Sequence, residues 1–360
     1  VNSLLDMYKE SGRLPKWELA AMETNVMVGD PAIPVLVDTY MRGIRDFNVE
    51  LAYQAMLKNA DIKRSDIDIV RPGYKEFVKF GYIPEPDGKE KVDIPVWGSV
   101  STGLEYCMAD YALACMAKDL GKEADYSLYM KRAGFYQNYY DAVTGFMRPI
   151  HKNGKWLDNF DPKPHVPVWH SRPGFVEGCS WHYSFFVPFD MCGLVQLNGG
   201  GISFVNKLID CFERGYFNMG NEPDISYPYL FNYVKGEEHR TQYWTRHCIN
   251  TYFGDNQNGI TDNDDCGTMS AWLVFTMIGL YPDCPANPVY QLTSPVFDKV
   301  TIQLNNKYYS GNSFVIQRGQ DTDNKMYIES IYLNGEKISG YSLKHSTLSK
   351  GGILSFILKE

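Results

Sequence analysis

The sequence ITDNDDCGTMSAW, residues 260–272, crowds four acidic or amide side chains into one turn ahead of an apolar segment: Asp262, Asn263, Asp264 and Asp265. Like charges in one turn repel, and each carboxylate raises the pKa of its neighbours. Such a turn can hold a cation through oxygen ligands, supply a general base that activates water, or cap the helix that follows. A cap needs only one aspartate. The surplus of acidic groups therefore favours a metal site or a catalytic site.

A further carboxylate, Glu177, lies in the segment RPGFVEGCSWHYSFFVPFD, residues 172–190. A carboxylate among Phe175, Trp181 and Tyr183 is expected to be poorly solvated, which raises its pKa and suits it to donate a proton near neutral pH. The alternative is a glutamate in the first turn of a helix, where the helix dipole stabilises its charge.

An amide and a carboxylate also stand together in the segment FNMGNEPDISYPYLFNYV, residues 217–234. Asn221 and Glu222 can bind a hard cation or sugar hydroxyls through their oxygens. Asn221 ahead of Pro223 is equally an ordinary cap of a helix that starts with proline. The segment itself does not separate the two readings.

Apolar residues recur near a 3.6-residue period over most of the chain before about residue 282, which is typical of helices. We therefore expect helices to position these loops. The spacing predicts helices over residues 31–44, 103–120, 123–141, 179–197, 202–215, 237–253 and 268–281. Short β-branched segments separated by Asn, Gly and Asp turns follow, and NGEK in particular predicts a hairpin. We expect a helical domain over residues 1–285 and a small antiparallel β domain over residues 286–360.

The composition excludes several classes of protein. The net charge is -8 and no Lys/Arg cluster is present, which argues against nucleic-acid binding. No apolar run approaches the roughly 20 residues of a membrane span. The eight cysteines lack the CxxC pairs of zinc sites, and their spacing does not predict disulfides. Aromatic residues make up 14% of the chain, and their amphipathic rings commonly hold sugars in clefts.

The chain resembles glycoside hydrolase family 92, whose members are calcium-dependent exo-α-mannosidases that invert the anomeric carbon. The resemblance runs in the correct order along nearly the whole chain. It is carried by LPKWEL (14–19), MVGDPAIPVLVDTYMRG (27–43), SVSTGLEYCMADYALACMA (99–117), FMRP (146–149), VEGCSWHYSFFVPFD (176–190), GNEPDISYPYLFNYV (220–234), DNDDCGTMSAWLVFTMIGLYP (262–282) and PVYQLTSPVFDKVTIQL (288–304).

The resemblance implies an (α/α)6-type helical barrel, or toroid, truncated at its N-terminus and followed by a small β-sandwich-like domain. Family members carry an N-terminal β-sandwich before the barrel, and LPKWEL belongs well inside their full length. We therefore expect a partner β-sandwich in the same parent chain, and we expect the excised segment to fold with little activity alone. Family members often read EGN-x-W-Q-Y-S and VPHD, where this chain has Cys179, His182 and Phe189.

The resemblance also gives the loops their roles. An inverting glycosidase needs a protonated carboxyl at the glycosidic oxygen and an ionised carboxylate that holds water on the opposite face. Glu177 is the expected acid and Asp265 the expected base, with Asp264 as the second choice. The expected Ca2+ ligands are Asn221, Asn263 and Asp264, with Glu222 and Asp262 as alternatives.

Several other side chains are expected to line the mannose subsite, against an equal expectation of packing for each tryptophan: Trp17, Glu18, Trp97, Trp181, His182 and Glu222. The expected substrates are mannose-containing glycans, either high-mannose N-glycans or mannan. Two alternatives are a non-catalytic glycan-binding relative and another helical-barrel carbohydrate-active enzyme such as a lyase, whose Tyr/His or Arg-rich site the acidic turn does not suit. The expected location is the periplasm, cell surface or exterior of a bacterium, for example a Bacteroides species.

Overall fold

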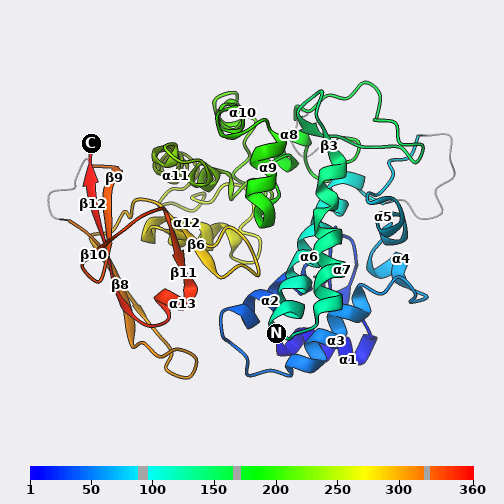
Figure 1. Cartoon of the computed structure of the whole chain (residues 1–360), viewed down its shortest axis with the longest axis horizontal. Helices are drawn as coiled ribbons and strands as arrows, with labels where there is room; N and C mark the ends of the chain where they lie inside the picture. The colour runs from blue at the N-terminus through cyan, green and yellow to red at the C-terminus, as the bar shows by residue number, and fades with distance from the viewer. Residues whose placement is uncertain (88–95, 165–171, 320–324) are drawn as a thin grey trace. The chain divides into compact units, whose positions relative to one another are not determined.

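The computed structural model describes residues 1–87, 96–164, 172–319 and 325–360. The chain forms two compact units (Figure 1). Unit 1 comprises Val1–Asp190 and Pro285–Asn287, and unit 2 comprises Met191–Cys284 and Pro288–Glu360. This division differs from the predicted division into residues 1–285 and 286–360, which stays a prediction about domains.

Unit 1 is mainly helical. Its helices and short strands are α1 (Asn2–Ser11), β1 (Glu18–Leu19), β2 (Met22–Glu23), α2 (Ala32–Met41), α3 (Val49–Asn59), α4 (Ile67–Val70), α5 (Tyr74–Phe80), α6 (Ser99–Asp119), α7 (Glu123–Ala133), the 3-10 helix η1 (Gly134–Tyr139), β3 (Tyr140–Asp141), β4 (Phe146–Met147), α8 (Ser180–Tyr183) and the 3-10 helix η2 (Pro188–Asp190).

The centre of unit 1 is α6, which is buried around almost its whole circumference. Its apolar and small residues face α2, α3 and α7. The helix α7, which follows α6 in the sequence, lies beside it (Figure 1). A helix without a polar face is stable only when neighbours cover every side, so α6 fixes the positions of the loops at its two ends.

Unit 2 joins helices to two sheets. Its elements are α9 (Met191–Leu197), α10 (Gly201–Glu213), the 3-10 helix η3 (Tyr227–Tyr233), α11 (Glu238–Tyr252), α12 (Thr268–Ile278), β5 (Leu280–Tyr281), β6 (Val289–Leu292), β7 (Lys299–Gln303), β8 (Ser313–Arg318), β9 (Tyr327–Leu333), β10 (Glu336–Ile338), β11 (Ser342–Lys344), α13 (His345–Leu348) and β12 (Gly352–Lys359).

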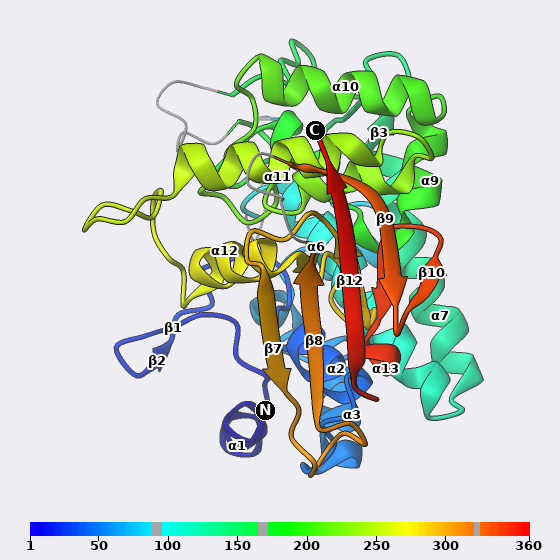
Figure 2. The same ribbon diagram turned by 90° about the vertical axis from the view of Figure 1, so that its left-hand side faces the viewer.

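The larger sheet of unit 2 has the order β10-β9-β12-β8-β7, and Figure 2 shows its strands side by side. The smaller sheet has the order β11-β6-β5. The predicted NGEK hairpin is confirmed, because Leu333 pairs with Glu336 across Asn334 and Gly335. Both turn residues have positive φ, 52° and 85°, as a tight two-residue hairpin turn requires.

Three sequence predictions need correction. The predicted helix over residues 123–141 ends at Ala133, and η1 and β3 follow it. The predicted antiparallel pairing fails at one pair, since β12 and β8 are parallel. The predicted helix over residues 179–197 is broken into α8, η2 and α9. Pro188 lacks the N–H that an uninterrupted helix needs, and it disfavours helical backbone at Val187 before it.

All eight cysteines lie in the described residues, and none forms a disulfide. Over those same residues, no helix is both long enough and apolar enough to span a bilayer.

Candidate active site

The loop that carries Glu177 is fixed to the start of α6 in unit 1. The backbone N–H groups of Val100 and Ser101 donate to the Gly174 carbonyl at 2.9 and 3.2 Å. The Val176 N–H donates in turn to Ser101 Oγ at 3.0 Å. Gly98, with φ of 67°, lies so close that a Cβ there would sit 2.5 Å from Val176 Cγ2. These contacts hold the loop immediately before Glu177 in one place.

Glu177 itself is exposed, although its neighbours Val176 and Gly178 are buried. Its φ is 48°, in the left-handed region that residues with a Cβ rarely adopt. The aromatic side chains near it in sequence, Phe175 and Tyr183, are buried in the core. The poor solvation expected for this carboxylate is therefore not found, and its role as the acid stays a prediction that rests on its placement.

Two of the predicted sugar-binding residues lie beneath this loop. Trp181 is buried, and its ring meets Phe146 edge to face with centroids 4.7 Å apart. His182 is buried as well, and a Cβ on Gly178 would sit 2.8 Å from His182 Nδ1. In this structure both side chains support the loop from below, as the packing alternative for the tryptophan expects.

Three other predicted sugar-binding residues of unit 1 are exposed. Trp17 and Trp97 are 41% and 43% exposed, and Glu18 is exposed in the β1–β2 hairpin. The Glu23 carboxylate secures that hairpin by accepting from the backbone N–H groups of Lys16 and Trp17. These side chains are open to a ligand.

A small cavity of about 120 Å³ in unit 1 is lined by Lys16 and Trp97, together with Thr102 and Tyr106. Burial lowers the pKa of Lys16 to about 8, with nearby Asp30 acting in the opposite direction. Gly98 lies close to Val176, and Trp97 and Glu177 are the sequence neighbours of these two residues. Sequence reasoning passed over Lys16, whose only signal is its place beside Trp17.

The acidic turn belongs to unit 2, where one of its aspartates accepts hydrogen bonds from the first turn of α12. Asp264 Oδ1 accepts from the Ser270 backbone N–H at 2.8 Å, and both carboxylate oxygens accept from Ser270 Oγ. This aspartate is half-buried, while Asp262, Asn263 and Asp265 are exposed. These hydrogen bonds thus account for one of the four side chains.

The remaining acidic residues of the turn have unusual backbone. The φ values of Asp262 and Asp265 are 55° and 45°, and Cys266 follows with 57°. Among the described non-glycine residues with positive φ, the acidic ones are these two aspartates and Glu177. Residues in such conformations cluster at functional sites, and here they include the predicted acid and the predicted base.

The loop with Asn221 and Glu222 lies against the acidic turn within unit 2. A Cβ on Gly220 would sit 2.7 Å from Asp262 Cβ and 3.4 Å from its Oδ2. Asn221 is only 9% exposed, and Glu222 is exposed. The absence of a side chain at Gly220 therefore allows the two oxygen-rich segments to approach each other.

Asp224 is buried and accepts a hydrogen bond from the backbone of this loop. It was not identified from the sequence. Its Oδ2 accepts from the Asn218 backbone N–H at 2.9 Å, and Asn218 Oδ1 accepts from the Gly220 N–H at 3.1 Å. Asp224 Oδ1 is buried without a hydrogen-bond partner in the described part of the chain. Burial raises the pKa of the Asp224 carboxyl well above its usual range. The only sequence signal is its place three residues after Asn221.

The donor chemistry of these segments suits a hard cation such as Ca2+, which binds carboxylate and amide oxygens. Within the described residues, however, no three His, Cys, Asp or Glu side chains gather closely enough to hold a metal ion. Carboxylates alone do not make a site. The amide oxygens of Asn221 and Asn263 would be needed to complete one, with water or ligand hydroxyls.

The whole chain, residues 1–360, matches the model of the glycosyl hydrolase family 92 catalytic domain. The chain belongs to glycoside hydrolase family 92. The resemblance found in the sequence is thereby confirmed.

Solved family members have the same fold. An inverting mannosidase of this family from Bacteroides thetaiotaomicron is 29% identical with a TM-score of 0.87, over 99% of this chain and 49% of that protein. A family α-mannosidase from the same organism, solved with mannoimidazole, is 30% identical with a TM-score of 0.88, over 99% of this chain and 47% of that one.

A curated relative is described as an uncharacterized secreted glycosidase of the fungus Arthroderma benhamiae. It is 30% identical over 99% of this chain and 48% of its own length. The chain thus spans about half the length of the relatives it matches.

Proposed function

We propose that this chain is the catalytic portion of an exo-α-mannosidase that removes terminal α-linked mannose from N-glycans or mannan with inversion. The observation that carries the proposal is the placement of the two predicted catalytic carboxylates. Glu177 and Asp265 are both exposed, and both lie in left-handed backbone within loops of a family 92 chain. Local strain at exposed carboxylates is typical of groups held for a reaction.

Glu177 acts in this proposal as the general acid, which protonates the glycosidic oxygen as the bond to the aglycone breaks. Asp265 acts as the general base, which removes a proton from the water that attacks the opposite face of the sugar ring. The product then has the β configuration. Asp264 is less suited to the base role, because its oxygens already accept from Ser270.

Exposed aromatic and acidic side chains bind the sugar in this proposal. Trp17 and Trp97 offer ring faces, and Glu18 and Glu222 offer acceptors for hydroxyls. Trp181 and His182 are buried and act by holding the Glu177 loop.

Calcium is part of the proposal. Asn221, Asn263 and Asp264 would hold the ion, with Asp262 and Glu222 as alternatives, and its charge would attract hydroxyl oxygens of the bound mannose. The close approach of the two loops at Gly220 and Asp262 supports this part of the proposal.

The family also suggests the wider architecture. We propose that the helices belong to an (α/α)6-type barrel, and that a β-sandwich in the same protein completes the sugar subsites. The relatives' greater length supports the further domain, and the secreted fungal relative supports a location outside the cytoplasm. The solved relatives from Bacteroides thetaiotaomicron support the proposal of a Bacteroides source.

The test is hydrolysis of α-1,2, α-1,3, α-1,4 and α-1,6 mannobiosides by the full-length protein, followed by NMR from the first turnover. We expect release of mannose from at least one linkage, with β-mannose as the first product. Binding of these sugars without release of mannose would indicate the non-catalytic relative instead. Initial α-mannose would exclude the inverting mechanism.

A further inference from the structure

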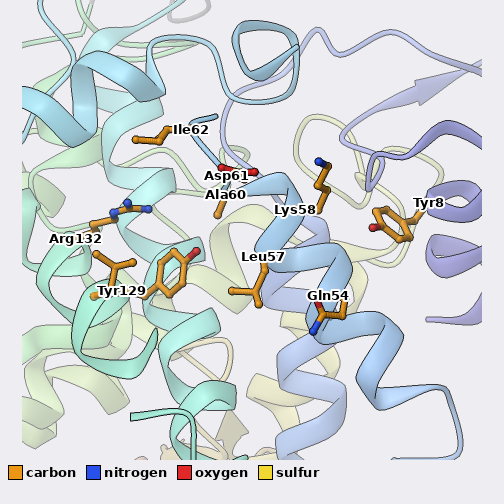
Figure 3. A pocket seen from close by; sticks show the side chains of 10 residues that line it. Tyr8, Gln54, Leu57, Lys58, Ala60, Asp61, Ile62, Tyr129 and Arg132 are labelled. Atoms are coloured by element: carbon orange, nitrogen blue, oxygen red, sulfur yellow. The ribbon is translucent and has the colours of Figure 1, made fainter. Parts of the chain in front are cut away.

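A second cavity, of about 420 Å³, lies within unit 1 and shares no residue with the candidate active site. It is formed by α1, α3 and α7 with the loop after α3, and its lining includes Tyr8, Leu57, Lys58, Asp61, Tyr129 and Arg132 (Figure 3). Its volume is within the range of roughly 300–1,000 Å³ that is usual for small-molecule sites.

Arg132 is the unusual feature of this cavity. Its side chain is nine-tenths buried, and Nη1 donates to the Tyr74 hydroxyl at 2.9 Å. No carboxylate lies within 4 Å of its guanidinium, and Nε and Nη2 have no hydrogen-bond partner, as far as the described residues extend. Figure 3 shows this guanidinium reaching from α7 toward the middle of the cavity.

Arg71, a buried arginine of the same unit, forms ion pairs that Arg132 lacks over the described residues. Arg71 contacts the carboxylates of Asp30 and Asp110, both at 2.7 Å. Arg132 reaches Asp110 only through the Tyr74 hydroxyl, which lies 2.8 Å from Asp110 Oδ2. The Nε and Nη2 atoms of Arg132 are not among the buried atoms that lack a partner in the described part of the chain, so water or a ligand in the cavity can reach them. Arg132 thus retains free donors that face a cavity.

The side chains that line the cavity indicate the chemical class of ligand that it can bind. A planar guanidinium with free N–H groups suits the paired oxygens of a carboxylate or phosphate. Leu57 and Tyr129 offer apolar surface for a ring, and the Asp61 carboxylate can accept from hydroxyl groups. Lys58 adds a second cation that has no ion-pair partner in the described part of the chain. The cavity is also larger than an inorganic ion requires.

We propose that this cavity binds an acidic monosaccharide, a sugar that carries a phosphate or a carboxylate group. Arg132 holds the anionic group, Tyr129 and Leu57 contact the ring, and Asp61 accepts from hydroxyls. This proposal is independent of the mannosidase activity proposed above.

Calorimetry on the full-length protein tests the proposal with mannose 6-phosphate, glucuronate, mannose and inorganic phosphate. We expect at least one acidic sugar to bind with a Kd below about 1 mM, and mannose to bind at least about tenfold more weakly at this site. Arg132→Met should weaken the acidic sugar by about 10–100-fold, and Arg132→Lys by less, because the paired donors are lost but the charge stays.

Arg132 also contacts Tyr74, so its variants require a check of folding by circular dichroism and thermal unfolding. Lys58→Glu provides a variant at an exposed position, and Lys63→Glu is its matched control, because Lys63 is exposed and does not line the cavity. We expect Lys58→Glu to weaken the acidic sugar and Lys63→Glu to leave it unchanged.

Binding that resists both Arg132→Met and Lys58→Glu would overturn the assignment, as would the absence of binding by either acidic sugar at about 10 mM. Phosphate that binds as tightly as mannose 6-phosphate would overturn the sugar part of the proposal. Glu177→Gln separates the two sites: it should slow mannobiose hydrolysis by about 10²–10⁴-fold and leave this binding intact.

Discussion

Substitution of Gly220 by alanine tests the contact that brings the loop with Asn221 against the acidic turn. A Cβ at this position would lie 2.7 Å from Asp262 Cβ. Carbon atoms in contact are normally about 3.5–4.0 Å apart, so one segment must move by about 1 Å. A misplacement of that size can cost about 10²-fold in rate. We expect kcat/KM on α-mannobiosides to fall by about 10–100-fold in the full-length protein.

The matched control is Gly134→Ala. Gly134 has φ of -68°, and no heavy atom lies within 4 Å of the position its Cβ would take. Its activity should equal that of the wild type. Thermal unfolding of both variants shows whether a lower rate reflects local displacement or loss of the fold.

A compensating variant makes the steric reasoning sharper. Asp262→Gly removes the Cβ that the new methyl group of Gly220→Ala would strike, and glycine tolerates the φ of 55° at position 262. If the clash is the cause, the Gly220→Ala substitution should cost much less activity on the Asp262→Gly background than on the wild type. Full activity of the Gly220→Ala single variant would refute the argument that this approach positions the site.

Three further predictions concern chemistry and stability. Glu177→Gln should slow mannobiose hydrolysis by about 10²–10⁴-fold, and its rate should recover on a dinitrophenyl mannoside, whose leaving group needs no acid. Asp265→Asn should hydrolyse both substrates slowly. If the activated substrate rescued Asp265→Asn and not Glu177→Gln, the acid and base assignments would be exchanged. EDTA should abolish activity, and calcium should restore it better than magnesium; full turnover after metal analysis shows the ion removed would exclude a catalytic metal. Burial lowers the pKa of Lys207 to about 7, so the folded state binds fewer protons than the unfolded state between pH 7 and 10.5. The free energy of unfolding should therefore rise with pH over that window. Lys207→Met should remove this rise and, in urea unfolding at pH 7, stabilise the protein by about 1–2 kcal/mol. A variant whose stability depends on pH as the wild type's does would contradict this.

The sequence predicted the elements whose information is local. The helices near residues 31–44, 202–215 and 237–253 appear within a few residues of their expected ends, because their apolar period and their breakers lie inside each segment. The hairpin at Asn334 and Gly335 is equally local, since its turn chemistry demands positive φ.

Features that depend on distant segments were missed. The parallel pairing of β12 with β8 joins Gly352 to Phe314, and no short-range pattern encodes that partner. The solvation of Glu177 was misjudged for the same reason. The aromatic residues near Glu177 in the sequence predicted an apolar environment for its carboxylate. In the structure Phe175 and Tyr183 are buried in the core, whereas Glu177 is exposed. Sequence neighbours do not determine which side of a loop faces solvent.

The four crowded side chains of the acidic turn now divide into separate roles. Asp264 accepts from the Ser270 backbone N–H in the first turn of α12, and such a hydrogen bond contributes about 1 kcal/mol. Three neighbouring residues, Asp262, Asp265 and Cys266, lie in left-handed backbone, which costs on the order of 1 kcal/mol each even where aspartate tolerates it. This hydrogen bond therefore does not offset the strain of the turn. A turn selected only to start a helix would need one aspartate and none of this strain, which supports the proposed roles of the exposed acids Asp262 and Asp265 in binding a cation and activating water.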